Sequence, residues 1–130
     1  MRDLTIYRLE RAQEYLTAAK CTLNREHCKF VVVAAFFAIF NAVRALLAEE
    51  QYEPKTFLAI IRHFRYEYIK TGVFEDKYFN YIGEAFRARQ YSDYGDFVVV
   101  SREEAETQYQ YAAEFCAAIK KYLEEINDNS

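Results

Sequence analysis

Residues Phe30–Ala48, FVVVAAFFAIFNAVRALLA, form the most apolar stretch of the chain and decide how the rest must fold. Only Asn41 and Arg44 interrupt it with polar side chains. A helix that is apolar on all sides is either the central helix of a soluble bundle or a membrane span. Because an amide and a guanidinium near its middle are costly in lipid, we interpret the stretch as a core helix covered by other helices.

The segments on both sides of this core helix carry apolar residues at three- and four-residue spacing, which is typical of amphipathic helices. The sequence therefore predicts an all-α fold, an up-and-down bundle of about five helices forming one domain over residues 1–130. The predicted helices run from Asp3 to about Arg25, from about Cys28 to Glu50, from the turn at Pro54 to about Lys70, from about Asp76 to Tyr91, and from Ser101 onwards.

Local signals mark several helix ends. Asp3 is suited to an N-cap, and Pro54 to the first turn of the third helix. Gly72 is expected to stop that helix. Ser101 and Glu104 form a capping-box pattern at the start of the last helix. Residues 92–100 are interrupted by a glycine and have no partner strand, so they are expected to form an irregular loop.

Composition limits the possible functions. The chain of 130 residues is 52% apolar and has only 3 Gly and 1 Pro, which excludes a disordered chain, a collagen-like repeat and most β-sandwiches. A net charge of −3 provides no strong field toward nucleic acid or anionic membrane, so any such binding requires a local patch. The 11 Phe and 12 Tyr exceed the needs of a five-helix monomer, which predicts a two-fold homodimer.

The cysteines and the chain start indicate a reducing, cytoplasmic location. Cys21, Cys28 and Cys116 are odd in number and lack CxxC spacing, and residues 1–10 lack the pattern of a signal segment. A metal site at Cys21, His27 and Cys28 would need a second ligand pair, which the sequence does not supply. No glycine-rich phosphate loop is present either, so the sequence predicts no metal or other cofactor.

Asn41 and Arg44 are the first candidate ligand-binding residues. They lie three residues apart on one face of the core helix, where an unpaired amide or guanidinium would be costly to bury. They either form a hydrogen-bond network with neighbouring helices or across a dimer, or they line a polar ligand pocket.

The second candidate group lies at the end of the fourth helix, RARQYSDY over residues 87–94. Arg89 and Asp93 are four residues apart and can pair if the helix continues that far. Arg87 and Arg89 beside Tyr94 have the chemistry to bind a phosphate and stack a base. Alternatively, the Arg89–Asp93 pair fixes the corner between helix and loop.

The order of these features resembles the HEPN family (higher eukaryotes and prokaryotes nucleotide-binding domain), in its small stand-alone bacterial branch. The resemblance spans nearly the whole chain. The residues that support it are the stretch AAFFAIFNAVRALL over 34–47, Pro54-Lys55-Thr56, Phe64, Lys70-Thr71-Gly72, Arg89, Asp93-Tyr94-Gly95 and the Ser-x-Glu-Glu-Ala start of the last helix.

The resemblance implies a helical bundle that forms a two-fold dimer and is often paired with a minimal nucleotidyltransferase in a toxin–antitoxin system. Many members of the family are metal-independent ribonucleases with an Arg-x4-6-His motif. Arg89 matches the arginine of this motif, but Tyr94 stands where a histidine would be expected, and His27 and His63 lie elsewhere in the sequence. Tyrosine ionises near pH ~10, so it is a poor general base at neutral pH.

The sequence thus predicts a non-catalytic HEPN-like dimer that binds nucleotide, RNA or a nucleotidyltransferase partner. Two alternatives remain open. One is a metal-independent endoribonuclease toxin using Arg89 with Tyr94 or another residue that is not histidine, and the other is a purely protein-binding helical dimer. The predicted ligand-binding residues are Asn41, Arg44, Arg87, Arg89, Asp93 and Tyr94.

Overall fold

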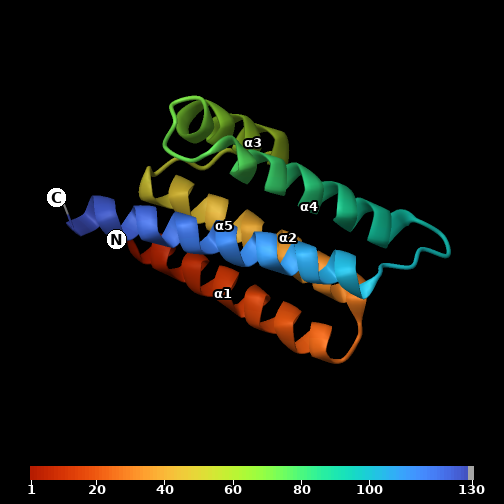
Figure 1. Cartoon of the computed structure of the whole chain (residues 1–130). Helices are drawn as coiled ribbons and strands as arrows, with labels where there is room; N and C mark the ends of the chain where they lie inside the picture. Colours follow the sequence, from red (N-terminus) through yellow and green to blue (C-terminus); the bar gives the residue numbers. More distant parts are fainter. Residues whose placement is uncertain (129–130) are drawn as a thin grey trace.

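The computed structural model describes residues 1–128, apart from the side chain of Tyr94. It confirms the all-α fold class, with five α-helices and one π-helical turn, η1, in the described part of the chain (Figure 1). The elements in order are α1 (Asp3–Asn24), α2 (Cys28–Glu49), α3 (Phe57–Phe64), η1 (Arg65–Ile69), α4 (Asp76–Tyr94) and α5 (Arg102–Asp128).

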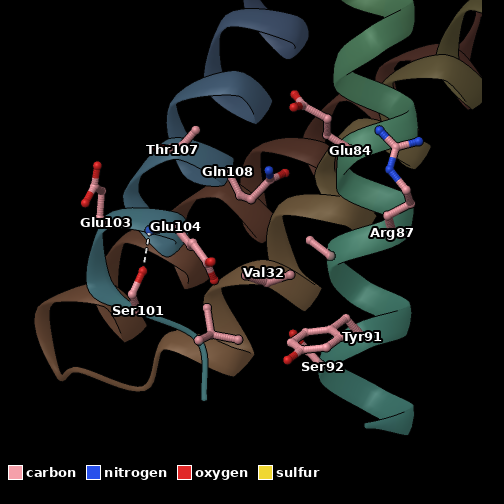
Figure 2. Close-up of a pocket in the computed structure, with 12 residues that line it drawn as sticks. Val32, Glu84, Arg87, Tyr91, Ser92, Ser101, Glu103, Glu104, Thr107 and Gln108 are labelled. Carbon is pink, nitrogen blue, oxygen red and sulfur yellow. Dashed lines mark hydrogen bonds between the residues drawn. The ribbon is translucent and has the colours of Figure 1, made fainter. Parts of the chain in front are cut away.

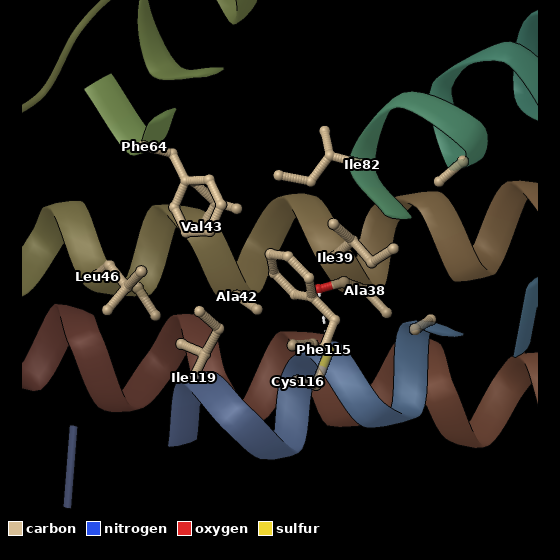
Figure 3. Close-up of a cluster of buried hydrophobic side chains, with 14 of the residues drawn as sticks. Ala38, Ile39, Ala42, Val43, Leu46, Phe64, Ile82, Phe115, Cys116 and Ile119 are labelled. Atoms are coloured by element: carbon tan, nitrogen blue, oxygen red, sulfur yellow. Dashed lines mark hydrogen bonds between the residues drawn. The ribbon is translucent and has the colours of Figure 1, made fainter. Parts of the chain in front are cut away.

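Helix α2 is the central helix, as its composition predicts. Helices α1 and α5 lie along one side of it, and α3 and α4 lie along the other (Figure 1). Figure 3 shows Phe64 and Ile82 meeting α2 from one side, while Phe115 and Ile119 of α5 meet it from the other. The core of the bundle therefore forms around α2, because each neighbouring helix has one apolar stripe to bury.

By length and hydropathy, α2 is also the one helix in residues 1–128 that is able to cross a membrane. Of its most apolar 18-residue window, 61% is buried inside the bundle. This burial favours the interpretation of α2 as a core helix.

Helix α1 begins at Asp3, as predicted, but two predictions about the residues at helix starts are wrong. Asp3 lies inside the first turn of α1, and Arg2 occupies the N-cap position in an extended conformation, where its backbone N–H donates to Glu49 Oε1 at 3.0 Å. Pro54 lies before α3 rather than in its first turn. The helix starts later because the Thr56 hydroxyl accepts a hydrogen bond from the Ala59 N–H at 3.1 Å and caps it.

The predicted third helix, from the turn at Pro54 to about Lys70, is divided into α3 and the π-helical turn η1. The Lys70 N–H donates to the Arg65 carbonyl, five residues back, at 2.9 Å. The wider turn places both Tyr68 and Ile69 in the core. Gly72 then ends the segment with a φ of +80°, a conformation that favours glycine, as predicted.

Helix α4 ends at Tyr94, three residues later than predicted, and Gly95 serves as its C-cap. The extension keeps Asp93 on the helix, one turn beyond Arg89. Residues 95–100 follow without regular structure, as predicted, whereas residues 92–94, which were also expected in this loop, belong to α4. Ser101 caps α5, since its Oγ accepts a hydrogen bond from the Glu104 N–H at 3.0 Å, which confirms this half of the capping box.

Candidate functional site

Arg89 lies where α4 crosses the central helix. Its guanidinium carbon is 4.8 Å from the ring centres of both Phe36 and Phe37 of α2. Its Nε lies 3.3 Å from Asp93 Oδ2, so the predicted pair one helical turn apart is confirmed. Two rings and one carboxylate thus fix the position of this arginine.

A connected cluster of aromatic rings surrounds this point. Tyr15 of α1 stacks on Phe37 with ring centres 5.4 Å apart, and Phe36 contacts Phe37 at 5.3 Å and Phe40 at 6.0 Å. Phe57 and Phe86 extend the cluster, stacked at 5.1 Å. Rings in such contact form a rigid apolar platform.

Two further arginines lie over rings of the same cluster. Arg11 of α1 is 5.3 Å from the ring centre of Tyr15, and Arg44 of α2 is 5.8 Å from that of Phe40. Three helices therefore each contribute one guanidinium to one set of rings. We call this surface the arginine–aromatic face and define it as Arg11, Tyr15, Phe36, Phe37, Phe40, Arg44 and Arg89.

The local sequence explains why this face is left partly open. Phe37, Phe40, Asn41 and Arg44 recur at three- and four-residue spacing along α2 and are all half-buried, whereas the helix positions between them are buried. They form the one stripe of α2 that the surrounding helices do not cover completely.

The Arg89 guanidinium has unused hydrogen-bonding capacity. Its Nε is within ion-pair distance of Asp93, yet its N–H is not aligned for a hydrogen bond, and the atom is buried with no other partner among the described residues. A donor buried without an acceptor costs free energy that an incoming oxygen atom would recover. Arg89 can therefore donate to a ligand oxygen without first breaking an aligned hydrogen bond.

Asn41 and Arg44 differ in how they are satisfied. The Asn41 amide donates to the Phe37 carbonyl of its own helix at 2.9 Å. The Arg44 guanidinium forms no ion pair within residues 1–128, and its ring contact with Phe40 leaves its N–H groups free to meet a ligand. Burial, followed by the charge of Arg8, lowers the pKa of Arg44, and the charge of Glu53 partly offsets this.

The other predicted site residues are placed apart from this face or are not described. Arg87 is exposed and lines a cavity between α4 and α5, on a different side of α4 from Arg89. The backbone of Tyr94 ends α4, but its side chain lies outside the described residues. The structure thus places Asn41, Arg44 and Arg89 beside neighbouring rings of α2, with Asp93 next to Arg89.

Arg11 and Tyr15 were not identified from the sequence. The signal that could have found them is their spacing of four residues, which places an arginine above a tyrosine on one helix face. Their approach to Phe37 could not be foreseen, because it depends on the packing of α1 against α2.

The two histidines lie at opposite ends of α2, away from Arg89. His27 is the N-cap of α2, and His63 Nε2 lies 3.0 Å from Glu50 Oε1, beyond the other end. Arg89 lies over Phe37, and Glu50 follows Phe37 by 13 residues. The contact between His63 and Glu50 is therefore about 20 Å along the helix from Arg89. His27 precedes Phe37 by ten residues, about 15 Å along the helix, so within one chain neither imidazole lies beside Arg89. In residues 1–128 no three Cys, His, Asp or Glu side chains are grouped as a metal site requires.

Comparisons with known proteins identify similar chains. The family model described as HEPN domain matches residues 6–122. The "Putative toxin MJ0142" of Methanocaldococcus jannaschii is 33% identical over 88% of this chain and 78% of its own length. "Putative toxin MJ0605" of the same organism is 32% identical over 91% of this chain and 87% of its own length. A "UPF0332 protein" of Thermotoga maritima is 28% identical over 92% of this chain and 91% of its own length.

Proposed function

This chain belongs to the HEPN domain family, and from that premise we propose that it is a toxin-like protein that binds nucleotide or single-stranded RNA. The observation that carries the proposal is the arginine–aromatic face, where Arg11, Arg44 and Arg89 all lie over one set of rings. The toxin class is supported by the names of two relatives that match most of the chain.

The face has the two features that binding a phosphate and a base requires. Guanidinium groups present planar sets of N–H donors that match phosphate oxygens, and the partly exposed rings of Tyr15, Phe37 and Phe40 offer surfaces for stacking. Arg89 would contact the phosphate through the N–H groups that Asp93 does not hold. The acidic net charge of the whole chain does not prevent this, because local charge decides contact at the face.

Cleavage of RNA requires a group that takes the proton of the 2′-hydroxyl and another that protonates the leaving oxygen. Tyr94 follows Arg89 after four intervening residues, where the family motif has its histidine, and both histidines of the chain are remote from the face. We therefore propose binding without catalysis. The family also implies a homodimer and a minimal nucleotidyltransferase partner. We propose that this chain forms a homodimer and is paired with such a nucleotidyltransferase in a toxin–antitoxin system.

The first test is binding of a fluorescent oligoribonucleotide and of ATP, measured by anisotropy and calorimetry. Arg89→Ala and Arg44→Leu are each expected to weaken binding at least about tenfold, since each removes a charged contact. Arg25→Ala removes an exposed arginine at the end of α1 and should leave affinity unchanged. Equal affinity in all four proteins would contradict the proposed site.

Arg44→Leu also separates binding from structure. Because Arg44 has no carboxylate partner in residues 1–128, its loss should leave the thermal midpoint nearly unchanged. A large loss of stability would instead assign Arg44 a structural role.

The second test is RNA cleavage in the presence of a chelator, which silences metal-dependent contaminants. The wild-type protein is expected to leave a mixed RNA pool intact. Cleavage that both Arg89→Ala and Tyr94→Phe abolish would contradict the non-catalytic proposal and support the metal-independent ribonuclease.

A further inference from the structure

The cavity between α4 and α5 lies on the other side of α4 from the arginine–aromatic face. Its volume is about 660 Å³, within the range typical of small-molecule sites. Figure 2 shows that it opens where the two helices stand apart, close to the start of α5. Val32 of α2, Ala88 of α4 and Val100 of the connecting loop supply apolar lining.

Two buried polar atoms in this cavity have no hydrogen-bond partner among the described residues. Ser92 is only 5% exposed, and its Oγ is unpartnered in the described part of the chain. Gln108 Oε1 is likewise buried and unpartnered. Figure 2 shows Ser92 on α4 and Gln108 on α5 directed toward the gap between the helices. A ligand that donates hydrogen bonds would satisfy both oxygens.

The charges around the cavity favour a cation over an anion. Glu84, Glu103 and Glu104 line it, and none of them forms an ion pair within residues 1–128. The one cationic residue in the lining is Arg87. Its side chain runs back along α4 over Gly83, so that its Nη1 lies 3.3 Å from the position that a Cβ atom at Gly83 would occupy. The acidic groups therefore dominate the open space, which would repel phosphate.

Tyr91 completes the site. Its side chain is 61% exposed and lines the cavity from α4, where a ring face can contact a cation. Acceptor oxygens, a ring and an apolar floor together match a chain of methylene groups carrying ammonium ends. A planar anionic ligand would match only the floor and the ring.

We propose that the cavity between α4 and α5 binds a small linear aliphatic amine of the polyamine class. One ammonium donates to Gln108 Oε1 and another to Ser92 Oγ, the methylene chain lies on Val32 and Val100, and the glutamates at the rim supply the opposite charge. This site uses none of the residues of the arginine–aromatic face, so it stands or falls independently of the proposed function.

The test is calorimetric titration of the full-length protein with spermidine at fixed ionic strength, with inorganic phosphate as the anionic probe. Saturable binding of spermidine and no binding of phosphate are expected. Gln108→Met and Ser92→Ala should each weaken spermidine binding about tenfold, because a hydrogen bond to a charged group is lost. The thermal midpoints of these two variants without ligand should stay equal or rise, since an unsatisfied polar atom is removed.

Glu84→Gln and Glu67→Gln form a matched pair that carries no folding risk, since both side chains are exposed and each change removes one charge. Glu84 lines the cavity, whereas Glu67 lies on η1. Weaker spermidine binding in Glu84→Gln alone would support the site. Equal weakening in both would show general attraction to an acidic protein and overturn it.

Three other outcomes would also overturn the proposal. They are the absence of spermidine binding at millimolar concentration, tighter binding of phosphate than of spermidine, and tighter binding of a blocked lysine peptide than of spermidine. The last result would assign the cavity to a basic side chain of a protein partner.

Discussion

At the scale of single residues, Arg8 shows how much a buried charge depends on its partners. Arg8 is 6% exposed, and its guanidinium donates to Glu53 at 2.7 and 3.2 Å and to the Arg44 carbonyl at 3.0 Å. The hydrogen bond from Arg8, followed by the effect of its charge, holds the pKa of Glu53 below its usual value despite partial burial. One side chain thus joins α1 to the end of α2 and the turn beyond it.

We therefore expect Arg8→Met to destabilise the fold by about 1–3 kcal/mol, because it leaves the Arg44 carbonyl and the Glu53 carboxylate without their donor. Lys20→Met removes a cation from an exposed position of the same helix and should change stability by less than about 0.5 kcal/mol. Urea unfolding of both variants measures the difference. Similar small effects in the two would show that the buried hydrogen bonds of Arg8 contribute nothing net.

At the scale of elements, the π-helical turn η1 sets the contact between the third helical segment and the end of α2. By turning Tyr68 inward, it lets the phenol hydroxyl donate to Glu50 Oε2 at 2.7 Å. Glu50 Oε1 also lies 3.0 Å from His63 Nε2. The residue that follows α2 is thereby connected to both α3 and η1.

This contact gives the fold a dependence on alkaline pH. Burial, followed by the hydrogen bond to Glu50 and its negative charge, raises the pKa of Tyr68 well above its usual value. The folded state therefore keeps the phenol proton after the unfolded state has lost it, and the stabilising contribution is complete below pH ~10 and lost as pH rises further.

Tyr68→Phe is accordingly expected to be less stable than wild type at pH 8, by about 1 kcal/mol for the lost hydrogen bond. The gap should narrow as the pH rises above ~10, by up to about 1.4 kcal/mol for each pH unit. Tyr91→Phe changes an exposed tyrosine and should keep the wild-type dependence. Denaturant unfolding at pH 8 and at several pH values above ~10 measures how the free energy of unfolding changes with pH. Parallel pH dependences for wild type and Tyr68→Phe would contradict a raised pKa of Tyr68 in the folded state.

At the scale of the whole molecule, the bundle leaves large apolar side chains in contact with solvent. Leu58 and Tyr66 are more than half exposed, and Phe97 and Val99 of the loop after α4 are almost fully exposed. Exposed apolar residues in such number favour association with another surface.

We expect the protein to form a dimer, so light scattering at micromolar concentration should give twice the chain mass of 15.4 kDa. Phe97→Ser and Val99→Ser remove exposed side chains of one loop and serve to test whether that loop takes part. A mass of 15.4 kDa for wild type across this concentration range would rule out the dimer.

The sequence by itself determined the helices and the central position of α2, because periodicity and all-round apolarity are local properties of the chain. It also identified Arg89 with Asp93, since a spacing of four residues brings side chains together on any helix. It did not separate Arg87 from Arg89, although two residues on a helix are 200° apart and point to different sides.

Only the tertiary structure decided which rings lie under which arginines and where polar atoms remain without partners. Arg11 and Tyr15 join Phe37 because α1 packs along α2, and Ser92 and Gln108 line one cavity because α4 and α5 diverge. The start of α1 likewise depends on Glu49, 47 residues from Arg2. Such contacts join residues distant in sequence, and their geometry is set by how whole helices pack, which no local pattern encodes.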